Sequence, residues 1–429
     1  MNMKNNFISE VMKSLWSEQS ELYQDVYRRF KSNPLNELVE ELRKRIDQSA
    51  GLIRGYDSPT FSEVFLPSTG CSHCLKESVF CGCSFCDFVS NDVEYFAKMK
   101  VIRDQSEEAY AQLICYAFKT SRGENVSASL SEAITLFDSL DVDEFPDTAY
   151  YMLFGQNQLY KKRPFQVEIE ARASSVTKDR LCVWKSHLPA RRLIVRMGVE
   201  VGDELLRNQW LNKSITDNEI YQAIEHLKES KCKSNANILI GIPGLNERQS
   251  INMFIDSVLW ADVAGFDQIV LSPLIYVGAS LQSYIATHNG SEGALFDCHT
   301  GFVSICAIYE GLVSILLREP SVITKIGISV FNMPVHWKQE KQAIGNSEDE
   351  EFVREAYDGL MDFNVQRDVH RILSLYSNLQ KTQLYSRYQS RVSTQSSNYI
   401  DTIYDLSKKL SMLLWHKDWE DKLNTLSLS

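Results

Sequence analysis

The sequence predicts an α/β fold built on a parallel sheet that is either open or closed into a barrel. Three segments are near-continuous apolar runs, as expected of parallel strands buried on both faces; they span residues 193–201, 236–242 and 268–277. Helical segments separate these runs. One begins after Thr216 and Glu219 and the other after Asn246 and Gln249, and both pairs have the spacing of a capping box. Strands that alternate with helices favour a parallel sheet covered by helices.

The same alternation extends toward the N-terminus. Further strand candidates are FSEVFLPST (61–69), AYYMLFG (149–155) and FQVEIEA (165–171). Asp104 and Glu107 have capping-box spacing before the helical pattern EEAYAQLICYAF. Ser129 and Glu132 give the same signal before AITLFDSL, so a helix is predicted there too.

Helical patterns flank this α/β region. Residues 1–50 are helical in pattern, and LNELVEELRKRI (35–46) has one apolar face, formed by Leu35, Leu38, Val39, Leu42 and Ile46. The chain after Pro334 is also helical in pattern, with packing as the default role. We therefore predict an N-terminal helical region (1–58), an α/β region (59–333) and a C-terminal helical region (334–429).

The composition is that of a soluble globular protein, with 429 residues, 44% hydrophobic residues and a net charge of −11. This acidity argues against a protein that mainly binds phosphate backbones, although Lys161, Lys162 and Arg163 form a local basic patch. No apolar run is long enough to span a bilayer, and the N-terminus lacks the apolar core of a signal peptide. A cytoplasmic location is expected.

Five of the ten cysteines fall between positions 71 and 86, in the segment GCSHCLKESVFCGCSFCDF (70–88). Cys71, Cys83 and Cys86 could hold three irons of a [4Fe–4S] cluster and leave the fourth iron free. Alternatively, these three and Cys74 could form a closed tetrahedral zinc site. Cys81 is extra in both interpretations. The loop follows the first strand candidate, where α/β barrels place their active sites, and this position favours the cluster.

The chain resembles the radical SAM superfamily from about residue 60 to about residue 290. Instead of the usual C-x3-C-x2-C motif, Cys71-Ser72-His73 and Cys83-Ser84-Phe85-Cys86 resemble the branch with a stretched first spacing. That branch includes the elongator catalytic subunit and archaeosine-biosynthesis radical SAM proteins. The resemblance implies a partial (β/α) barrel of radical SAM type, with Cys71, Cys83 and Cys86 as cluster ligands.

Further segments carry the resemblance downstream, namely EIEARAS (168–174), GVEVGDELLRNQWLNKSIT (198–216) and NILIGIPGLNE (237–247). They imply an S-adenosylmethionine (SAM) site, to which we assign Phe85, Arg172, Glu200, Lys213 and Gly241. The superfamily motif that contacts the SAM amino group has no clear copy, and Phe154-Gly155-Gln156 is the nearest candidate.

The resemblance implies an enzyme that reductively cleaves SAM to a 5′-deoxyadenosyl radical, which abstracts hydrogen from a substrate. A small biosynthetic molecule is favoured as substrate, with a reducing partner such as flavodoxin or ferredoxin. Leu274, Ile275 and Tyr276 are expected to line the pocket, and the C-terminal helices to cover it. Two alternatives remain: a tRNA-modifying enzyme, which the acidic charge disfavours, and a zinc-stabilised binding protein without enzymatic activity.

Overall fold

The structure is a computed structural model of the chain. It describes residues 7–48, 55–58, 61–65, 69–76, 78–86, 92–122, 133–137, 148, 152, 166–187, 192–288, 300–329, 332–344 and 349–424.

An eight-stranded sheet forms the centre of the described chain, in the order β1-β2-β5-β6-β7-β8-β9-β10. Its strands are β1 (Gly55–Ser58), β2 (Phe61–Phe65), β5 (Ala133–Phe137), β6 (Gln166–Glu170), β7 (Arg192–Glu200), β8 (Lys233–Ile240), β9 (Gln268–Pro273) and β10 (Ile326–Ile328). The strand β1 is antiparallel to β2, and every other pair is parallel.

The parallel strands follow one another in chain order, without the reversal that marks a doubly wound sheet. Such a progression is the arrangement of a (β/α) barrel, and the sheet stays open between β1 and β10. The predicted partial α/β barrel is therefore confirmed.

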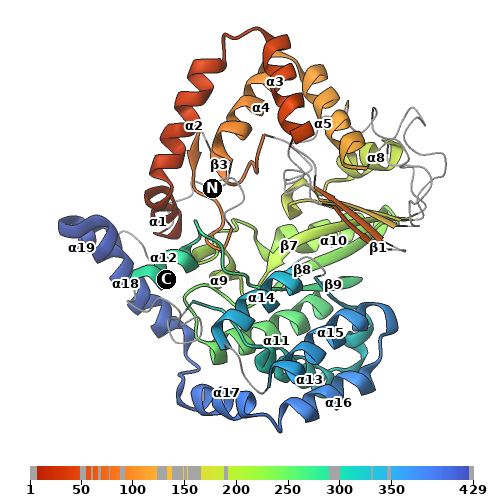
Figure 1. The fold of residues 1–429 in the computed structure, drawn as a ribbon, viewed down its shortest axis with the longest axis vertical. Helices are drawn as coiled ribbons and strands as arrows, with labels where there is room; N and C mark the ends of the chain where they lie inside the picture. The colour runs from red at the N-terminus through yellow and green to blue at the C-terminus, as the bar shows by residue number, and fades with distance from the viewer. Residues whose placement is uncertain are drawn as a thin grey trace.

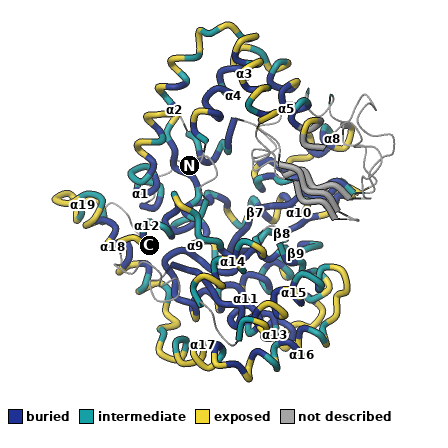
Figure 2. The backbone as a smooth tube through the Cα atoms, in the orientation of Figure 1, coloured by how far each residue is buried: buried dark blue, intermediate teal, exposed yellow. Residues whose placement is uncertain are grey.

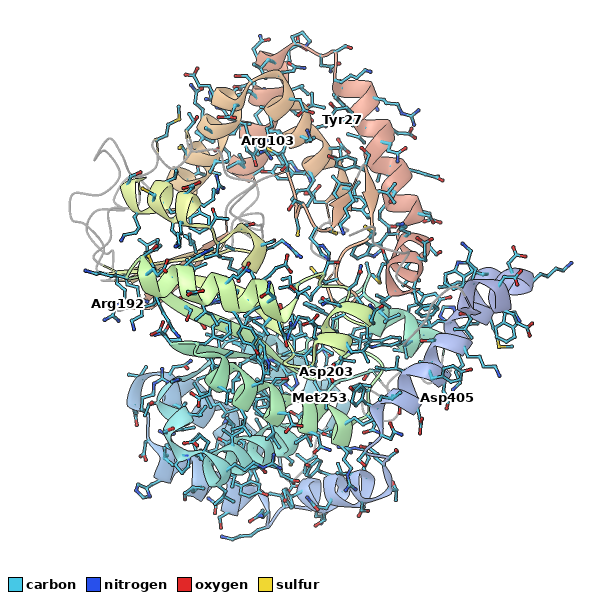
Figure 3. All side chains as sticks on the ribbon, turned by 180° about the vertical axis from the view of Figure 1, so that it is seen from behind. Tyr27, Arg103, Arg192, Asp203, Met253 and Asp405 are labelled. Carbon is cyan, nitrogen blue, oxygen red and sulfur yellow. The ribbon has the colours of Figure 1, made fainter. Side chains whose placement is uncertain are left out.

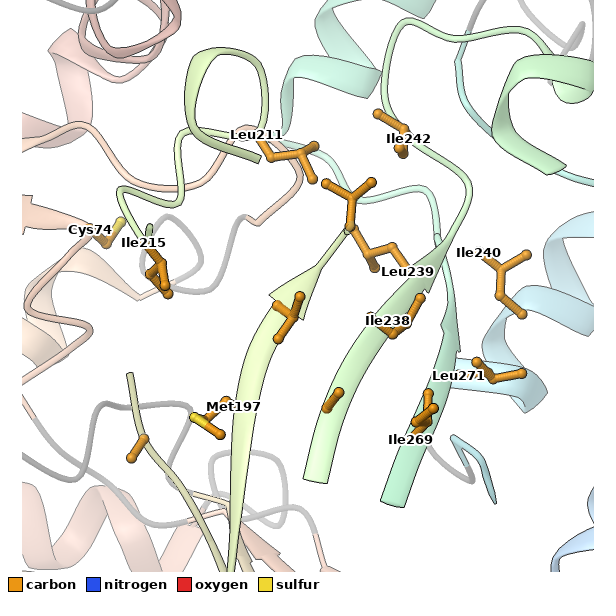
Figure 4. Close-up of a cluster of buried hydrophobic side chains, with 14 of the residues drawn as sticks. Cys74, Met197, Leu211, Ile215, Ile238, Leu239, Ile240, Ile242, Ile269 and Leu271 are labelled. Carbon is orange, nitrogen blue, oxygen red and sulfur yellow. The ribbon is translucent and has the colours of Figure 1, made fainter. Parts of the chain in front are cut away.

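One face of the sheet is apolar and packs against helices. Its side chains alternate along the strands, with Met197 on β7, Ile238 on β8 and Ile269 on β9 (Figure 4). The helices of the α/β region are α8 (Lys178–His187), α9 (Glu204–Gln209), α10 (Asp217–Glu229), α11 (Glu247–Ala264), α12 (Leu281–His288) and α13 (Ile305–Arg318). Both α10 and α11 contact β8, so the apolar face is the outer face of the partial barrel.

The N-terminal helices gather at one end of the molecule (Figure 1). They are α1 (Phe7–Leu15), α2 (Ser17–Phe30), α3 (Leu35–Gln48), α4 (Val93–Gln105) and α5 (Glu107–Arg122). Their inner faces are buried and their outer faces exposed (Figure 2), with Leu38, Leu42 and Ile46 buried on α3 as its sequence pattern predicts. The Trp16 Nε1 atom donates to the Ala279 carbonyl at 2.7 Å, which joins this end to the α/β region.

The C-terminal part is helical, as predicted. Its helices are α14 (Asn332–Ile344), α15 (Glu350–Gln366), α16 (Val369–Leu379), α17 (Gln383–Thr394), α18 (Tyr399–Trp415) and α19 (Trp419–Asn424). Figure 3 places Asp203 near the centre of the molecule and Asp405 of α18 further out. The Tyr399 hydroxyl donates to Asp203 at 2.6 Å, and the rings of Phe7 and Trp415 lie 5.8 Å apart. The chain thus packs its two ends together, while the boundaries at 58 and 333 stay a prediction.

Two capping boxes are confirmed, at Thr216–Glu219 and Asn246–Gln249. The one at Asp104–Glu107 is wrong, because Asp104 lies within α4. Instead, the Ser106 hydroxyl accepts from the Ala109 amide at the start of α5.

The helix predicted after Ser129 and Glu132 is also wrong, because residues 133–137 form β5 between β2 and β6. The segment AITLF is as apolar as a buried strand, and its place within the sheet prevails over the apparent cap. The strand predicted at 149–155 falls outside the described residues except for Met152. Among the described helices, none is both long and apolar enough to cross a membrane.

Candidate functional site

The candidate site residues follow the carboxyl ends of neighbouring strands. The cysteine loop comes after β2, Arg172 after β6, Gly241 after β8 and Leu274 after β9, whereas Glu200 is the last residue of β7. Because the strands are parallel, these ends meet at one edge of the sheet, where barrel folds place their active sites. The topology therefore brings residues from the whole α/β region to a single edge.

The five clustered cysteines fall into two groups by exposure. Cys71, Cys83 and Cys86 are partly exposed, whereas Cys74 and Cys81 are buried, with 4% and 2% of their surfaces accessible. Burial raises the pKa of the Cys74 thiol well above its usual value, and the four neighbouring cysteines raise it further. The three accessible thiols are those predicted as cluster ligands.

A short hairpin fixes the two buried cysteines. It consists of β3 (Leu75–Lys76) and β4 (Val79–Phe80), and just beyond it the Cys81 amide donates to the Cys74 carbonyl at 2.8 Å. A Cβ atom on Gly82 would lie 2.7 Å from the Cys74 sulfur, so this position requires glycine. Cys74 and Ile215 both belong to the hydrophobic core, part of which is drawn in Figure 4. Cys74 thus has a packing role.

Asn212 clamps the loop from the segment that follows α9. Its side-chain amide donates to the carbonyls of Cys81 and Gly82 at 2.5 and 2.8 Å, and its own carbonyl lies 2.5 Å from His73 Nε2. Its φ is +57°, a left-handed conformation that asparagine adopts more readily than most residues. Sequence reasoning missed Asn212, although its tolerance of positive φ and its place beside Lys213 were signals.

Lys213 and Glu200 form a buried ion pair beside the loop, with 3.1 Å between Nζ and Oε1. The ammonium also lies 5.6 Å from the centre of the Phe85 ring. Burial alone would lower the pKa of Lys213, but the Cys83 thiolate and the Glu200 carboxylate raise it above its usual value. Two of the predicted site residues, Phe85 and Glu200, therefore lie beside the ammonium of a third, Lys213.

Glycine at position 198 makes room for this pair. A Cβ there would lie 2.6 Å from Glu200 Oε1 and 2.8 Å from Lys213 Nζ. Glu200 itself has a φ of +68° at an irregularity of the β7–β8 ladder. Its second oxygen accepts from Asn237 Nδ2 at 3.0 Å. Gly198 and Asn237 are further residues that sequence reasoning missed.

Arg172, just after β6, binds the segment that follows α9 and carries Lys213. Its guanidinium donates to the carbonyls of Lys213 and Ser214, at 2.5 and 3.1 Å. Burial lowers the pKa of His73 well below its usual value, and the positive charge of Arg172 lowers it further. His73 is therefore neutral at physiological pH. The predicted contact of Arg172 with SAM stays a prediction.

Gly241 has a structural reason to be glycine. Its φ is +106°, and a Cβ would lie 2.2 Å from the Gly301 carbonyl oxygen. The predicted approach of Gly241 to an adenine ring stays a prediction, and Gly155 lies outside the described residues. Tyr276 exchanges two hydrogen bonds of 2.8 Å with the Gln339 side chain, so this candidate lining residue is held by α14.

The donor set fits a [4Fe–4S] cluster. Such a cluster takes one thiolate for each iron that it binds to the protein, and Cys71, Cys83 and Cys86 offer three accessible thiols on one loop. The cation of Lys213 lies close enough to Cys83 to offset thiolate charge. Within the described ranges, no three His, Cys, Asp or Glu side chains are close enough together to hold a single metal ion.

No family model matches the sequence, and no curated protein matches it. Among solved structures, the chain is similar to the radical SAM methyltransferase TsrM from Kitasatospora setae, solved with cobalamin and a [4Fe–4S] cluster (13% identity, TM-score 0.36, 70% of this chain and 60% of that chain). It is also similar to coproporphyrinogen III oxidase from Escherichia coli, described as a radical SAM enzyme (12% identity, TM-score 0.35, 50% and 45%).

A third similar structure is methylornithine synthase (12% identity, TM-score 0.36, 87% of this chain and 96% of that chain). The chain spans three fifths or less of the length of the first two structures. All three identities are below 25% and all three TM-scores are below 0.5, so the function of this chain has to be inferred from its own residues.

Proposed function

We propose that this chain is a radical SAM enzyme that acts on a small biosynthetic molecule by hydrogen abstraction. The observation that carries the proposal is the grouping at one sheet edge of three accessible cysteines with the Glu200–Lys213 pair. A zinc knuckle needs neither a strand-end position nor a buried ion pair beside it.

Each residue has a defined task in this proposal. Cys71, Cys83 and Cys86 hold the cluster, and Asn212 keeps their loop in place through its bonds to Cys81 and Gly82. When bound, the cluster and SAM supply one-electron chemistry that no side chain can provide. Lys213 offsets the negative charge of the thiolates, as its proximity to Cys83 favours.

The same residues orient SAM. Glu200 lies at the end of β7 and presents a carboxylate suited to ribose hydroxyls, and Phe85 presents an aromatic ring between two ligand cysteines. Arg172 fixes the 213–214 backbone, which keeps Lys213 in position. Gly241 and Gly155 complete the proposed SAM site. An exogenous electron donor such as flavodoxin or ferredoxin completes the proposed system.

The test is anaerobic reconstitution with iron and sulfide, followed by reduction with dithionite in the presence of SAM. We expect about four irons per chain, as one [4Fe–4S] cluster requires, and release of 5′-deoxyadenosine. Cys83→Ala and Cys86→Ala should abolish both. Cys182→Ala is the matched control, because Cys182 is exposed on α8 outside the loop.

Stoichiometric zinc, no iron uptake and no 5′-deoxyadenosine would overturn the proposal and leave a zinc-stabilised binding protein. Salt-sensitive binding of bulk tRNA by the reconstituted protein would instead favour the tRNA-modifying alternative.

A further inference from the structure

The sheet face opposite the helices carries a row of polar residues. Alternate residues of β6, β7 and β8 that point away from the apolar core include Glu168, Glu170, Arg196 and Asn235. The register places Glu170 beside Arg196 and Arg196 beside Asn235. Because neighbouring strands bring these side chains together, they form one polar surface on the inner face of the partial barrel.

Three of these residues are joined by short hydrogen bonds. Glu168 Oε1 accepts from Arg196 Nε at 2.7 Å and from Asn235 Nδ2 at 2.6 Å. All three side chains are buried, with 4%, 8% and 1% of their surfaces accessible. A buried ion pair contributes little net stability, so stability alone does not explain why Glu168 and Arg196 are paired inside the protein.

The Asn235 side chain ends in an acceptor for which the described residues provide no hydrogen-bond donor. Its Nδ2 atom donates to Glu168, and its Oδ1 atom is buried with no hydrogen-bond partner in the part of the chain that the structure describes. A buried polar atom left unpaired costs about 1–3 kcal/mol, and native proteins rarely tolerate it without a reason. A ligand that donates a hydrogen bond at this place would remove the cost.

Glu170 supplies a second acceptor in the same row. Its side chain is partly accessible, and no hydrogen bond or ion pair to it is found in the described part of the chain. The row holds two carboxylates and one guanidinium, from Glu168, Glu170 and Arg196, so it has one excess negative charge when both carboxylates are ionised. Acceptors together with excess negative charge suit a cationic donor such as a protonated amine.

The row lies next to the proposed radical site. Glu170 is two residues before Arg172, and it interacts electrostatically with both Glu200 and Lys213. Although part of the residue is accessible, removal of its carboxyl group from water raises the pKa of Glu170 to about 7, and Arg196 opposes this shift. A ligand held by this row would therefore lie beside the residues assigned to the cluster and SAM.

We propose that Glu170 and Asn235 form the substrate-recognition site and bind a protonated amine of a small polar substrate. This inference rests on the proposed function, because only that function makes the bound amine a substrate. The amine donates to the Glu170 carboxylate and to Asn235 Oδ1, and Arg196 and Glu168 hold the asparagine in position. An amino-bearing small molecule is thus the substrate class.

The test uses the reconstituted full-length protein and three matched probes of equal chain length, namely pentylammonium, pentanol and pentanoate. Their dissociation constants are measured by ligand-observed NMR titration at pH 8. We expect pentylammonium to bind at least tenfold more tightly than the other two. Glu170→Gln should weaken pentylammonium binding about tenfold, and Glu170→Asp should restore part of the affinity.

Glu225→Gln is the matched control, because Glu225 is an exposed carboxylate on α10, which packs on the opposite face of the sheet. Thermal unfolding of each variant verifies that it is folded. Equal binding of the three probes, or unchanged affinity in Glu170→Gln, would overturn the inference.

Iron content measured on the same samples separates the two proposals. If the protein holds about four irons per chain but shows no preference for pentylammonium, the radical SAM proposal stands and the amine site is rejected. Amine binding that depends on Glu170 in a protein without iron keeps the amine site and rejects the radical SAM function.

Discussion

The ammonium of Lys213 lies 3.1 Å from a carboxylate oxygen of Glu200, and both side chains are buried at the carboxyl edge of the sheet. The two residues come from different elements, the end of β7 and the segment after α9. Their pairing therefore fixes that segment, which also carries Asn212 and so holds the cysteine loop.

Removal of the Lys213 cation should destabilise the fold strongly, because among the described residues it leaves the buried Glu200 carboxylate with Asn237 as its remaining hydrogen-bond partner. We expect Lys213→Met to lower the free energy of unfolding by about 3 kcal/mol, as measured by denaturant titration. The control is Lys178→Met, whose pair with Glu229 is exposed to solvent and therefore contributes little to stability. Equal effects of the two variants would show that the buried pair has no special importance.

The identity of the third cluster ligand can be tested with two single substitutions. Cys71→Ala should lose iron, because Cys71 is partly exposed, whereas Cys74→Ala should retain it, because Cys74 is buried against Gly82. The measurement is iron content and visible absorbance after anaerobic reconstitution. The reverse result would make Cys74 the ligand and Cys71 dispensable.

Gly241→Ala should destabilise the protein by about 2–4 kcal/mol, because alanine would adopt a φ of +106° with its Cβ 2.2 Å from the Gly301 carbonyl. Gly278→Ala is the control, since a Cβ there has no heavy atom within 4 Å. Thermal unfolding of both variants checks the prediction. A Gly241→Ala protein as stable as the wild type would mean that this backbone contact is easily relaxed.

Glu340 should make stability depend on pH. The residue is fully buried, and its carboxylate accepts from the Tyr357 hydroxyl at 2.6 Å and from the Ile305 amide at 3.0 Å. Burial raises its pKa to about 7, while those hydrogen bonds and Arg391 oppose the shift and Glu247 adds to it. Between its usual pKa of 4.5 and about 7 the folded protein holds a proton that the unfolded chain releases.

Stability from this group is therefore present at low pH and lost as pH rises through about 7. Glu340→Gln should remove this loss and be more stable than the wild type at pH 8, by up to about 3 kcal/mol. Glu351→Gln, at an exposed position of α15, is the control. His336, whose pKa burial lowers to about 3, gives the opposite slope below pH 6.5, so the three proteins are compared between pH 6.5 and pH 8. A Glu340→Gln profile parallel to the wild type would contradict the assignment.

Much of the fold could be predicted because the apolar runs of β7, β8 and β9 and the caps at Thr216 and Asn246 are local signals. The strands before β6 were harder to predict from the sequence. AITLF follows a cap-like pair, and only its pairing between β2 and β6 shows that it is a strand. Such pairing depends on residues far away in the chain, so a local pattern could not decide it.

The sequence pointed to several residues that meet at this edge of the sheet, but it did not point to Asn212, Gly198 or Asn237, nor to how these residues are connected. The cysteine count and the matches at Glu200 and Lys213 identified the parts, and the sequence could not show which thiols are buried. Nor could it show Asn212 holding a loop 130 residues earlier, since that contact forms only when the sheet brings the two segments together.

The Asn212 clamp also has a consequence for assembly. Its bonds to Cys81 and Gly82 close a loop of 130 residues or more, which includes β6 and β7. Contacts of such long range form late in folding because of the entropy that loop closure costs. Iron delivered to the nascent chain would meet five unorganised thiols, whereas iron delivered to the folded barrel meets three. Maturation of this protein should therefore be a post-folding event, and a chain released before its β7 segment should not retain a cluster.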